Sequence, residues 1–540
     1  MPESAGTPQL QSPVVPNSTA PAPPPVFDRA EIRKKTRKRT TQRLVRVGVA
    51  LVALLVVIVG ATFGYAEYRN HQITRIKVGN LVALPPSGVE NVVLVGSTSR
   101  CALKQQNKAF GLCSQGVTGV NSDVVMILHV DPNNKTASIL SVPRDLFVPN
   151  ARASGANKID AALVEGPQQL VSAIQDDFGI PIHHYVELNF DSFQGVVNAL
   201  GGIKMYFPEP VFDAYSGLNV PVAGCRQLDG FQALAVVRAR HLQYKGPGVK
   251  TNNHADWPQD PESDLSRIRR DHEFLRVLAS AVDKRGLSNP ITDNDLLSAV
   301  APQLQVDSGF SLGQMFGLVT TFHGINIGKT PQQTLPVVVL ASLNYYYQGY
   351  DYGNVELTSQ PNDLQAVSSF LGIGPDRDTM TGKPLPAPGS VTVSVLNGTG
   401  QTGQAGQTSA ALKALGFETV GQGDGSGGGS LSETTVYYSS SSHLAAAEQV
   451  LHSLSGAVTL GKGPTTDGAE VTVVTGTNFS VNAPAPSKSS SQATSSGAGT
   501  STPTPPSSGT AGTLAAPTAP TQALAPFDPR SCTPSGGAGS

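Results

Sequence analysis

A long uncharged run near the start of the sequence constrains the fold most. It extends from Val47 to Ala66 and holds only apolar or small residues. At 1.5 Å rise per residue, about twenty residues span about 30 Å, which is the thickness of the hydrocarbon core of a bilayer. We therefore expect a single transmembrane helix over residues 47–66 of an integral membrane protein.

The charges around this run predict its orientation. Lysines and arginines crowd the stretch from Arg29 to Arg46, and a basic flank stays in the cytoplasm. We expect residues 1–46 to be cytoplasmic, and the rest of a single-pass chain to face outward from the cell membrane. A cleaved signal peptide is the alternative, but its apolar core is about 7 to 15 residues long and ends at small residues. A basic segment can also bind nucleic acid; next to a membrane span it is a topology signal, and no nucleic-acid partner is predicted.

Composition separates folded from unfolded segments of this chain of 540 residues. Residues 1–26 are rich in Pro, Ser and Ala, and residues 482–540 are mostly Ser, Thr, Pro, Ala and Gly, charged only at Lys488, Asp528 and Arg530. Such segments have too little apolar side chain to offset the entropy of ordering, so we predict that the tail over 482–540 is disordered. The remainder is long enough for one large domain and one small one.

The four cysteines gain meaning from the predicted export, because thiols outside the cytoplasm tend to pair. Cys101 and Cys113 bracket a short polar loop and are the disulfide candidates. Cys532 lies in the predicted disordered tail without an evident local partner, and Cys225 completes the set. Four cysteines allow three pairings, which stay open. No zinc-type spacing is present, and the histidines are interpreted as structural.

Hydrophobic periodicity predicts the fold class. Strands are expected near residues 91–95, 124–130, 137–142 and 185–190, the second and third joined by a hairpin turn at 131–135. Helices are expected at 167–178, 191–200, 229–241 and 263–286. This alternation predicts an α/β (α+β) domain over residues 88–345 with a central mixed sheet flanked by helices. A linker over 346–390 and a small α/β domain over 391–476 follow.

Two neighbouring helices are rich in arginine. Arg238 and Arg240 end the first, and Arg267, Arg269 and Arg270 lie in the first turns of the second. The helix dipole favours anions at an N-terminus, so arginines there indicate an anionic partner. The alternative is ordinary salt bridging to the acidic residues beside them, which are Glu262, Asp264 and Asp271.

Two further arginines follow strands. Arg100 comes after the first strand and Arg144 after the hairpin. Guanidinium groups match phosphate oxygens bidentately, so arginines converging beside a carboxylate predict a polyphosphate site with a divalent metal. Asp123 is the predicted metal ligand.

Six motifs occur together in one order. They are Val-Leu-Val-Gly-Ser-Thr-Ser-Arg (93–100), Asn-Ser-Asp (121–123), Val-Pro-Arg-Asp (142–145), Asn-Lys-Ile-Asp-Ala-Ala (157–162), Val-Arg-Ala-Arg-His (237–241) and Asp-Leu-Ser-Arg-Ile-Arg-Arg (264–270). This ordered set resembles the LytR-CpsA-Psr family over about residues 88–285. A second resemblance, to the C-terminal domain often attached to LytR, covers about 391–475.

The resemblance implies a phosphotransferase that moves a glycopolymer phosphate from a polyprenyl-pyrophosphate carrier to peptidoglycan at the outer membrane face. It implies a lipid-linked glycan donor, a peptidoglycan acceptor, and magnesium, with manganese as the alternative cofactor. The positions matching the pyrophosphate-binding set are Arg144, Arg238, Arg240, Arg267 and Arg270, and the position after the first strand adds Arg100. The residues expected to be catalytic are Asp123, Arg144, Arg267 and Arg270, with Asp123 also holding the metal. Family members transfer teichoic acids, capsules or arabinogalactan.

The sequence departs from the family pattern at two positions. Members usually carry Asp where this chain has Thr98, and Arg where it has Asn121. Both changes remove charge, and each is expected to weaken binding by on the order of 1 to 3 kcal/mol. Two alternatives to transfer therefore stand: a weak enzyme that still binds polyprenyl-pyrophosphate glycans, and a wall-binding scaffold. The apolar helix from Phe231 to Val237 is interpreted as lining a slot for the lipid tail or as plain core.

The small domain is predicted to have the order β-α-β-β-α-β. Its strands are expected near 391–396, 417, 435–438 and 471, and its helices at 404–415 and 442–454. The loop from Gly421 to Ser432 is mostly Gly and Ser, and the domain contains no convergent set of titratable residues. We interpret it as a binding or spacing module.

Overall fold

The computed structural model describes residues 68, 71–101, 103, 111–285, 301–311, 313–315, 317–318, 330–340, 344–425, 431–482 and 524–532. The predicted transmembrane helix over 47–66 and the predicted cytoplasmic segment lie outside these residues. Within the described part of the chain, no helix is both long and apolar enough to cross a membrane. The chain divides into two compact units, residues 1–68 and 69–540, and all that follows concerns the second.

A mixed sheet of seven strands forms the centre of the large domain, in the order β1-β13-β7-β2-β3-β4-β14. The bounds are β1 (Thr74–Ile76), β2 (Glu90–Ser97), β3 (Ser122–Asp131), β4 (Thr136–Val142), β7 (His184–Leu188), β13 (Gln305–Asp307) and β14 (Gln332–Thr334). Strand β3 pairs antiparallel with β2 and β4, whereas β7 is parallel to β2. The predicted mixed α/β class and the predicted β3–β4 hairpin are therefore confirmed.

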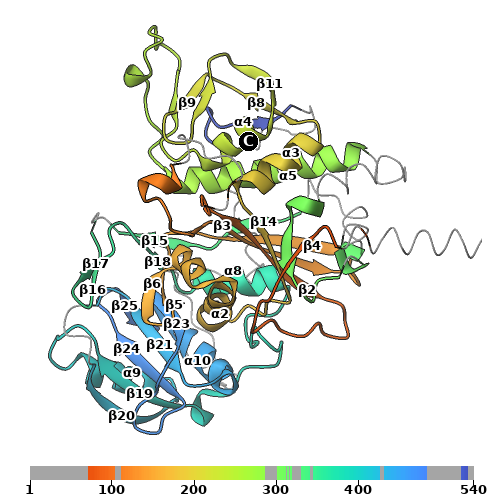
Figure 1. Ribbon diagram of the computed structural model, residues 1–540. Coiled ribbons are helices and arrows are strands. Elements are labelled where there is room, and N and C mark those ends of the chain that lie inside the picture. The colour runs from red at the N-terminus through yellow and green to blue at the C-terminus, as the bar shows by residue number, and fades with distance from the viewer. Residues whose placement is uncertain are drawn as a thin grey trace, which may run out of the picture. The chain divides into compact units, whose positions relative to one another are not determined.

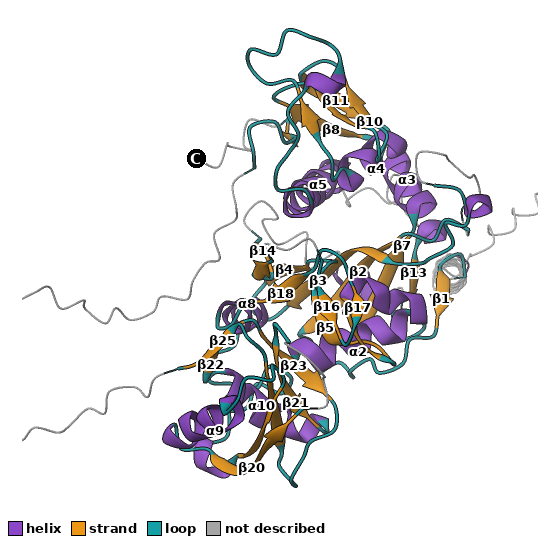
Figure 2. Cartoon of the chain, turned by 90° about the vertical axis from the view of Figure 1, so that its left-hand side faces the viewer, coloured by secondary structure: helices purple, strands orange, loops and turns teal. Residues whose placement is uncertain are grey.

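Helices cover both faces of this sheet (Figure 2). On one face lie α3 (Phe190–Ala199), α4 (Gly230–Arg238) and α5 (Asp264–Arg285). On the other lie α2 (Pro167–Phe178) and α8 (Asn362–Leu371). Leu170 and Ile174 of α2 are fully buried against Val93 and Ile127 of the sheet. Apolar residues at helical spacing thus close the core on the α2 side.

The stretch 346–390, predicted to be a linker, instead contributes to the fold. It contains β16 (Tyr346–Tyr347), β17 (Tyr350–Asp351), β18 (Glu356–Thr358) and α8. Val367 and Phe370 of α8 are buried in the same core as α2. The linker prediction is wrong here because Leu364, Val367, Phe370 and Leu371 recur at helical spacing and need an apolar surface to cover.

Shorter strands complete the large domain. They are β5 (Phe147–Arg152), β6 (Gly155–Lys158), β8 (Ile203–Phe207), β9 (Val211–Asp213), β10 (Leu218–Val220), β11 (Gly224–Leu228), β12 (Gln243–Tyr244) and β15 (Val337–Val339). Above α5 in Figure 1, β8 and β11 form an antiparallel pair.

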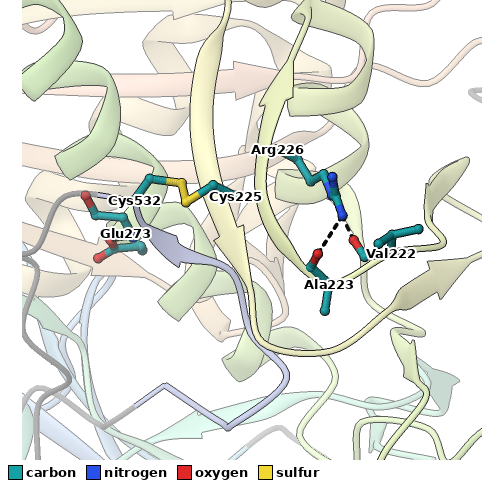
Figure 3. The surroundings of a disulfide bond; sticks show 7 residues. Val222, Ala223, Cys225, Arg226, Glu273 and Cys532 are labelled. Atoms are coloured by element: carbon teal, nitrogen blue, oxygen red, sulfur yellow. Dashed lines mark hydrogen bonds between the residues drawn. A yellow bond between two sulfur atoms is a disulfide. The ribbon is translucent and has the colours of Figure 1, made fainter.

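The C-terminal segment corrects the prediction that residues 482–540 are disordered. Within it, residues 524–532 are ordered, and β26 (Arg530–Ser531) pairs antiparallel with β8. Phe527 stacks on Tyr244 with ring centroids 3.9 Å apart. Cys532 forms a disulfide with Cys225 of β11, and Figure 3 shows this bond with Glu273 beside it. The prediction is wrong here because it rested on the average composition of the tail, which does not reflect the short stretch with Phe527 and Cys532.

The small domain has a sheet of five strands in the order β20-β19-β24-β21-β23. Its elements are β19 (Thr392–Asn397), α9 (Gln404–Ala414), β20 (Glu418–Asp424), β21 (Thr434–Tyr438), α10 (Leu444–Leu451), β22 (Leu454–Gly456), β23 (Val458–Lys462), β24 (Val471–Thr475) and β25 (Phe479–Val481). The predicted order omits β23, a short strand between glycines whose Val458 and Leu460 are buried. The small domain contacts the large one, since the Tyr438 hydroxyl donates to the Asp176 carbonyl at 2.9 Å.

Candidate functional site

The hairpin register brings Asp123 and Arg144 together. Strand β3 begins at Ser122 where β4 ends at Val142, with Val125 opposite Val142. Asp123 and Arg144 therefore lie at the same end of these two strands, and their side chains form an ion pair. The second Nη atom of Arg144 lies 3.1 Å from Asp160 Oδ2. The predicted convergence of a strand-end arginine with a carboxylate is observed.

A second set of ion pairs adjoins the first through Asp145. Its carboxylate lies 3.0 Å from Lys158 Nζ and 3.2 Å from Arg240 Nη2. Burial acts to raise the pKa of Asp145, but the charges of Arg144, Lys158 and Arg240 outweigh it and lower that pKa. For Asp160 burial prevails over Arg144, and its pKa is raised. Cations and carboxylates here compensate one another in one continuous network.

Helix α5 extends this network through Arg267. Arg267 Nη2 lies 3.1 Å from Asp264 Oδ2, and Arg240 Nε lies 3.0 Å from Asp264 Oδ1. Asp264 is the first residue of the helix and bridges the two arginines. Arg267 is only 3 % exposed. The structure thus shows the salt bridging that was the alternative interpretation of these arginines, and an anionic partner stays a prediction.

Arg270 is not brought to this network, contrary to its prediction as a pyrophosphate ligand. Its fully buried guanidinium lies 2.8 Å from Asp528 Oδ1 and 3.3 Å from Asp260 Oδ2. It also donates to the Ala239 carbonyl. Arg270 therefore holds the C-terminal segment against α5, and sequence reasoning missed this because Asp528 is 258 positions away.

Arg100 and Arg238 meet at one aromatic ring. Their guanidinium carbons lie 5.8 Å and 4.7 Å from the ring centroid of Phe190. Burial lowers the pKa of each, while Asp123 acts in the opposite direction. Both therefore lie within electrostatic reach of Asp123, as the sequence predicted.

The two departures from the family motif bond to each other. The Thr98 hydroxyl accepts the Asn121 backbone N–H at 2.9 Å, and Asn121 Nδ2 donates to Asp160 Oδ2 at 3.0 Å. Thr98 is buried. Both neutral side chains, Thr98 and Asn121, thus have hydrogen-bond partners within the fold.

Magnesium fits these residues poorly. Among the described residues, no group of three or more His, Cys, Asp or Glu side chains could hold a metal ion. Asp123 is engaged by Arg144, and the Thr98 hydroxyl by Asn121. Magnesium prefers several oxygen ligands, of which one or two carboxylates come from the protein.

An apolar cavity of about 160 Å³ opens beside the network. It lies between the sheet and helices α3, α4 and α5, the layers separated in Figure 2. Its walls include Leu94, Met126, Val186, Phe193, Leu234, Val237 and Leu275, and its charged residues are Asp123, Arg238 and Asp271. In the helix predicted to line a lipid slot or to be core, Leu234 and Val237 line the cavity whereas Ala235 and Val236 are buried core.

Two acids of the site, Glu356 and Asp271, have pKa values that suit proton transfer, a role that was not identified from the sequence. Burial, followed by the charges of Asp264 and Asp145, raises the pKa of Glu356 to about 7. Burial raises the pKa of Asp271 to about 8 against the opposing charges of Arg267 and Arg270. Glu356 Oε2 is buried without a hydrogen-bond partner within the described structure. No sequence signal pointed to Glu356, because it lies in the stretch predicted to be a linker.

The disulfide predicted as a candidate is present, joining Cys101 to Cys113. It closes the segment that follows Arg100, and the Asn121–Asp123 motif follows that segment in the chain. The second bond, between Cys225 and Cys532, resolves the pairing that the sequence left open.

The arginine–carboxylate network and the apolar cavity beside it belong to one α/β domain. Residues 67–362 match the model of the LytR_cpsA_psr family, and residues 390–479 match a model described as LytR cell envelope-related transcriptional attenuator. The first match covers more than half of the chain, which therefore belongs to the LytR_cpsA_psr family.

Named relatives are of moderate similarity. A probable cell wall biosynthesis protein of Corynebacterium glutamicum, LcpB, is 28% identical over 326 residues, covering 60% of this chain and 70% of the relative. TagT of Bacillus subtilis, a polyisoprenyl-teichoic acid–peptidoglycan teichoic acid transferase, is 28% identical over 347 residues, covering 60% and 91%. The solved LytR-Csp2A-Psr enzyme from Actinomyces oris is 26% identical, covering 49% of this chain and 88% of its own, with a TM-score of 0.40.

Proposed function

We propose that this chain is a transferase that moves a glycopolymer phosphate from a polyprenyl-pyrophosphate carrier to peptidoglycan. The observation that carries the proposal is the apolar cavity bordered by Asp123 and Arg238, next to the network around Arg144. An apolar slot beside converging cations is complementary to a lipid tail attached to a pyrophosphate. The name of TagT, a transferase of lipid-linked teichoic acid to peptidoglycan, supports the same reaction.

The arginines act by position and charge. Phosphoryl transfer needs little covalent help from a protein; it needs alignment and neutralisation of the phosphate oxygens. Arg144, Arg240 and Arg267 are held in place by Asp160, Asp145 and Asp264 before any ligand arrives. Such preorganised donors cost no rearrangement at the moment of reaction.

The reaction exchanges one phosphorus–oxygen bond for another. A peptidoglycan hydroxyl oxygen forms a bond to the phosphorus that carries the glycan. The bond from that phosphorus to the bridging oxygen breaks, and polyprenyl monophosphate leaves with the electron pair. The hydroxyl proton passes to a carboxylate. We assign this role to Glu356, whose backbone N–H donates to the Asp145 carbonyl at 3.0 Å and whose Oε2 is buried without a hydrogen-bond partner among the described residues. Burial raises its pKa to about 7, which suits a base at neutral pH.

Three finer expectations stay proposals. We propose that residues 47–66 anchor the chain in the cell membrane with the described unit outside, where a lipid-linked donor is met. Magnesium, or manganese, stays a prediction that the single engaged carboxylate of Asp123 supports weakly. The transferred glycopolymer is to be sought among teichoic-acid, capsular and arabinogalactan-type donors.

One assay tests the function against its alternatives. The full chain in lipid nanodiscs is incubated with a radiolabelled polyprenyl-pyrophosphate oligosaccharide and peptidoglycan, and wall-bound label is counted with and without magnesium. Label should appear on the wall, and Arg144→Ala should abolish it. Tight donor binding without product would identify the weak relative. Donor binding indifferent to Arg144→Ala would reject the phosphate site and leave the scaffold.

A further inference from the structure

A second and larger cavity, of about 720 Å³, lies at the opposite end of the central strands. Its walls come from the segment before β2, the β3–β4 turn, the start of β14 and the segment after α8. Asn91 near the start of β2 lines it, whereas Ser97 at the end of that strand lines the first cavity. Leu94 of the same strand also lines the first cavity, so about three residues of strand, roughly 10 Å, lie between the nearest wall residues of the two cavities. This volume lies within the range of ligand pockets.

Asn91 organises the polar wall of this cavity. Its Nδ2 donates to the Pro181 carbonyl at 2.7 Å, which fixes the orientation of the amide. Asn91 Oδ1 is therefore an acceptor, and it lies 2.7 Å from His129 Nδ1. The Asn91 backbone N–H donates to His183 Nδ1 at 2.8 Å. One buried asparagine thus engages the Nδ1 atoms of two imidazoles.

These contacts determine the tautomers. His129 Nδ1 faces an acceptor and must carry the proton, so its Nε2 is an acceptor. His183 Nδ1 accepts the hydrogen bond from the Asn91 N–H and so carries no hydrogen, and in the neutral ring its Nε2 carries the hydrogen and is a donor. Both imidazoles line the cavity, and neither Nε2 forms a hydrogen bond within the described part of the chain. The two imidazoles that line the cavity therefore carry one donor and one acceptor of fixed identity.

The environment keeps both rings neutral. Burial lowers the pKa of His183 to about 4 and lowers that of His129, which Asp131 opposes only in part. Asp131 itself accepts from the Asn133 and Asn134 backbone amides. The rest of the lining is mostly hydroxyl, amide and apolar, including Ser87, Asn134, Thr136, Ser138 and Thr381.

We propose that this cavity binds an uncharged sugar unit of a wall glycan. A sugar hydroxyl donates and accepts at once, and neighbouring hydroxyls match the His183 donor and the His129 acceptor. A phosphate or carboxylate would find no arginine in the cavity lining among the described residues. A stem peptide offers donors and acceptors too, but its carboxylates and ammonium would face a wall whose charges are confined to Asp131 and Lys135 in the turn.

A binding measurement with oligosaccharides that are not transferred tests this proposal independently of the transfer reaction. The full chain in nanodiscs is titrated calorimetrically with an N-acetylglucosamine tetramer, a neutral galactan or arabinan oligosaccharide, and a soluble stem peptide. We expect saturable binding of one neutral oligosaccharide. The N-acetylglucosamine tetramer would identify the acceptor strand as the source, and the hexose or pentose oligomer would identify the donor glycan.

Variants separate this cavity from the arginine network. Thr136 is exposed at the edge of the cavity, so Thr136→Trp should abolish binding without disturbing buried bonds. His129→Phe and His183→Phe should each weaken it at least tenfold, with folding checked by thermal melting. Asn219→Trp, on the exposed side of β10, is the matched control and should bind normally, as should Arg144→Ala. No saturable saccharide binding at millimolar concentration, or binding unaffected by Thr136→Trp, would overturn the proposal. Stem-peptide binding that Thr136→Trp blocks would assign the cavity to peptide instead.

Discussion

The two ends of strands β2 and β3 differ in the polar side chains that they carry, charged at one end and mostly neutral at the other. At one end, Asp123 and Arg144 belong to a network in which every carboxylate has a cation beside it. At the other, Asn91 contacts two imidazoles that burial keeps neutral, and hydroxyl and amide side chains line the same cavity. Charge is placed where phosphate oxygens must be neutralised, and fixed neutral donors and acceptors where hydroxyls are to be recognised.

The largest effect we expect is on stability, from an arginine outside this comparison. Arg270→Ala leaves Asp260 and Asp528 buried without their cation, which should lower the free energy of unfolding by about 3 to 5 kcal/mol. Thermal denaturation measures this loss, and Asp528→Asn should cause a smaller one. If Arg270→Ala abolished donor binding while melting normally, Arg270 would belong to the charged end after all.

Arg144→Ala should break the charged end itself. The change removes a donor aimed at the phosphates and the cation that pairs with Asp123 and Asp160, so transfer should fall by about 100- to 1000-fold. Transfer rate at saturating donor is the measurement. Arg144→Lys keeps the charge without the planar fork and should recover only part of the rate. Rates near that of the wild type would exclude this arginine from the reaction.

Glu356→Gln tests the proposed base. A carboxylate accepts a proton only when ionised, and its raised pKa of about 7 means that the wild-type rate should rise as pH passes upward through that value. The variant should be slower by about 100-fold and lose the rise. A pH–rate profile measures both, with exposed Glu418→Gln as the control. An unchanged profile in Glu356→Gln would move the base elsewhere.

Thr98→Asp should have the smallest effect and the opposite sign. A second carboxylate near Asp123 should improve magnesium binding and raise the transfer rate by about tenfold, equivalent to about 1.4 kcal/mol. Thr98→Asn, similar in size but neutral, is the control. If the two variants transferred at equal rates across a magnesium titration, a carboxylate at position 98 would not contribute to catalysis through magnesium.

Local pattern predicted the charged end well and the neutral end not at all. Arg144 and Asp123 were accessible to sequence reasoning because a hairpin brings the end of one strand to the start of the next. Arg270 was misassigned because its partner Asp528 lies in a tail whose composition indicates disorder. Glu356 was missed because it lies in the stretch 346–390, which was predicted to be a linker. Asn91, His129 and His183 come from three segments, and only the folded sheet places their polar atoms together.

Photo-crosslinking of the donor shows which cavity holds its lipid tail. A polyprenyl-pyrophosphate oligosaccharide with a diazirine on its lipid tail is bound to the full chain and irradiated, and labelled peptides are mapped by mass spectrometry. We expect labels on α3, α4 and α5 around Phe193, Leu234 and Leu275, which line the apolar cavity. Labels confined to residues 82–89 or the end of α8, at the neutral cavity, would contradict it.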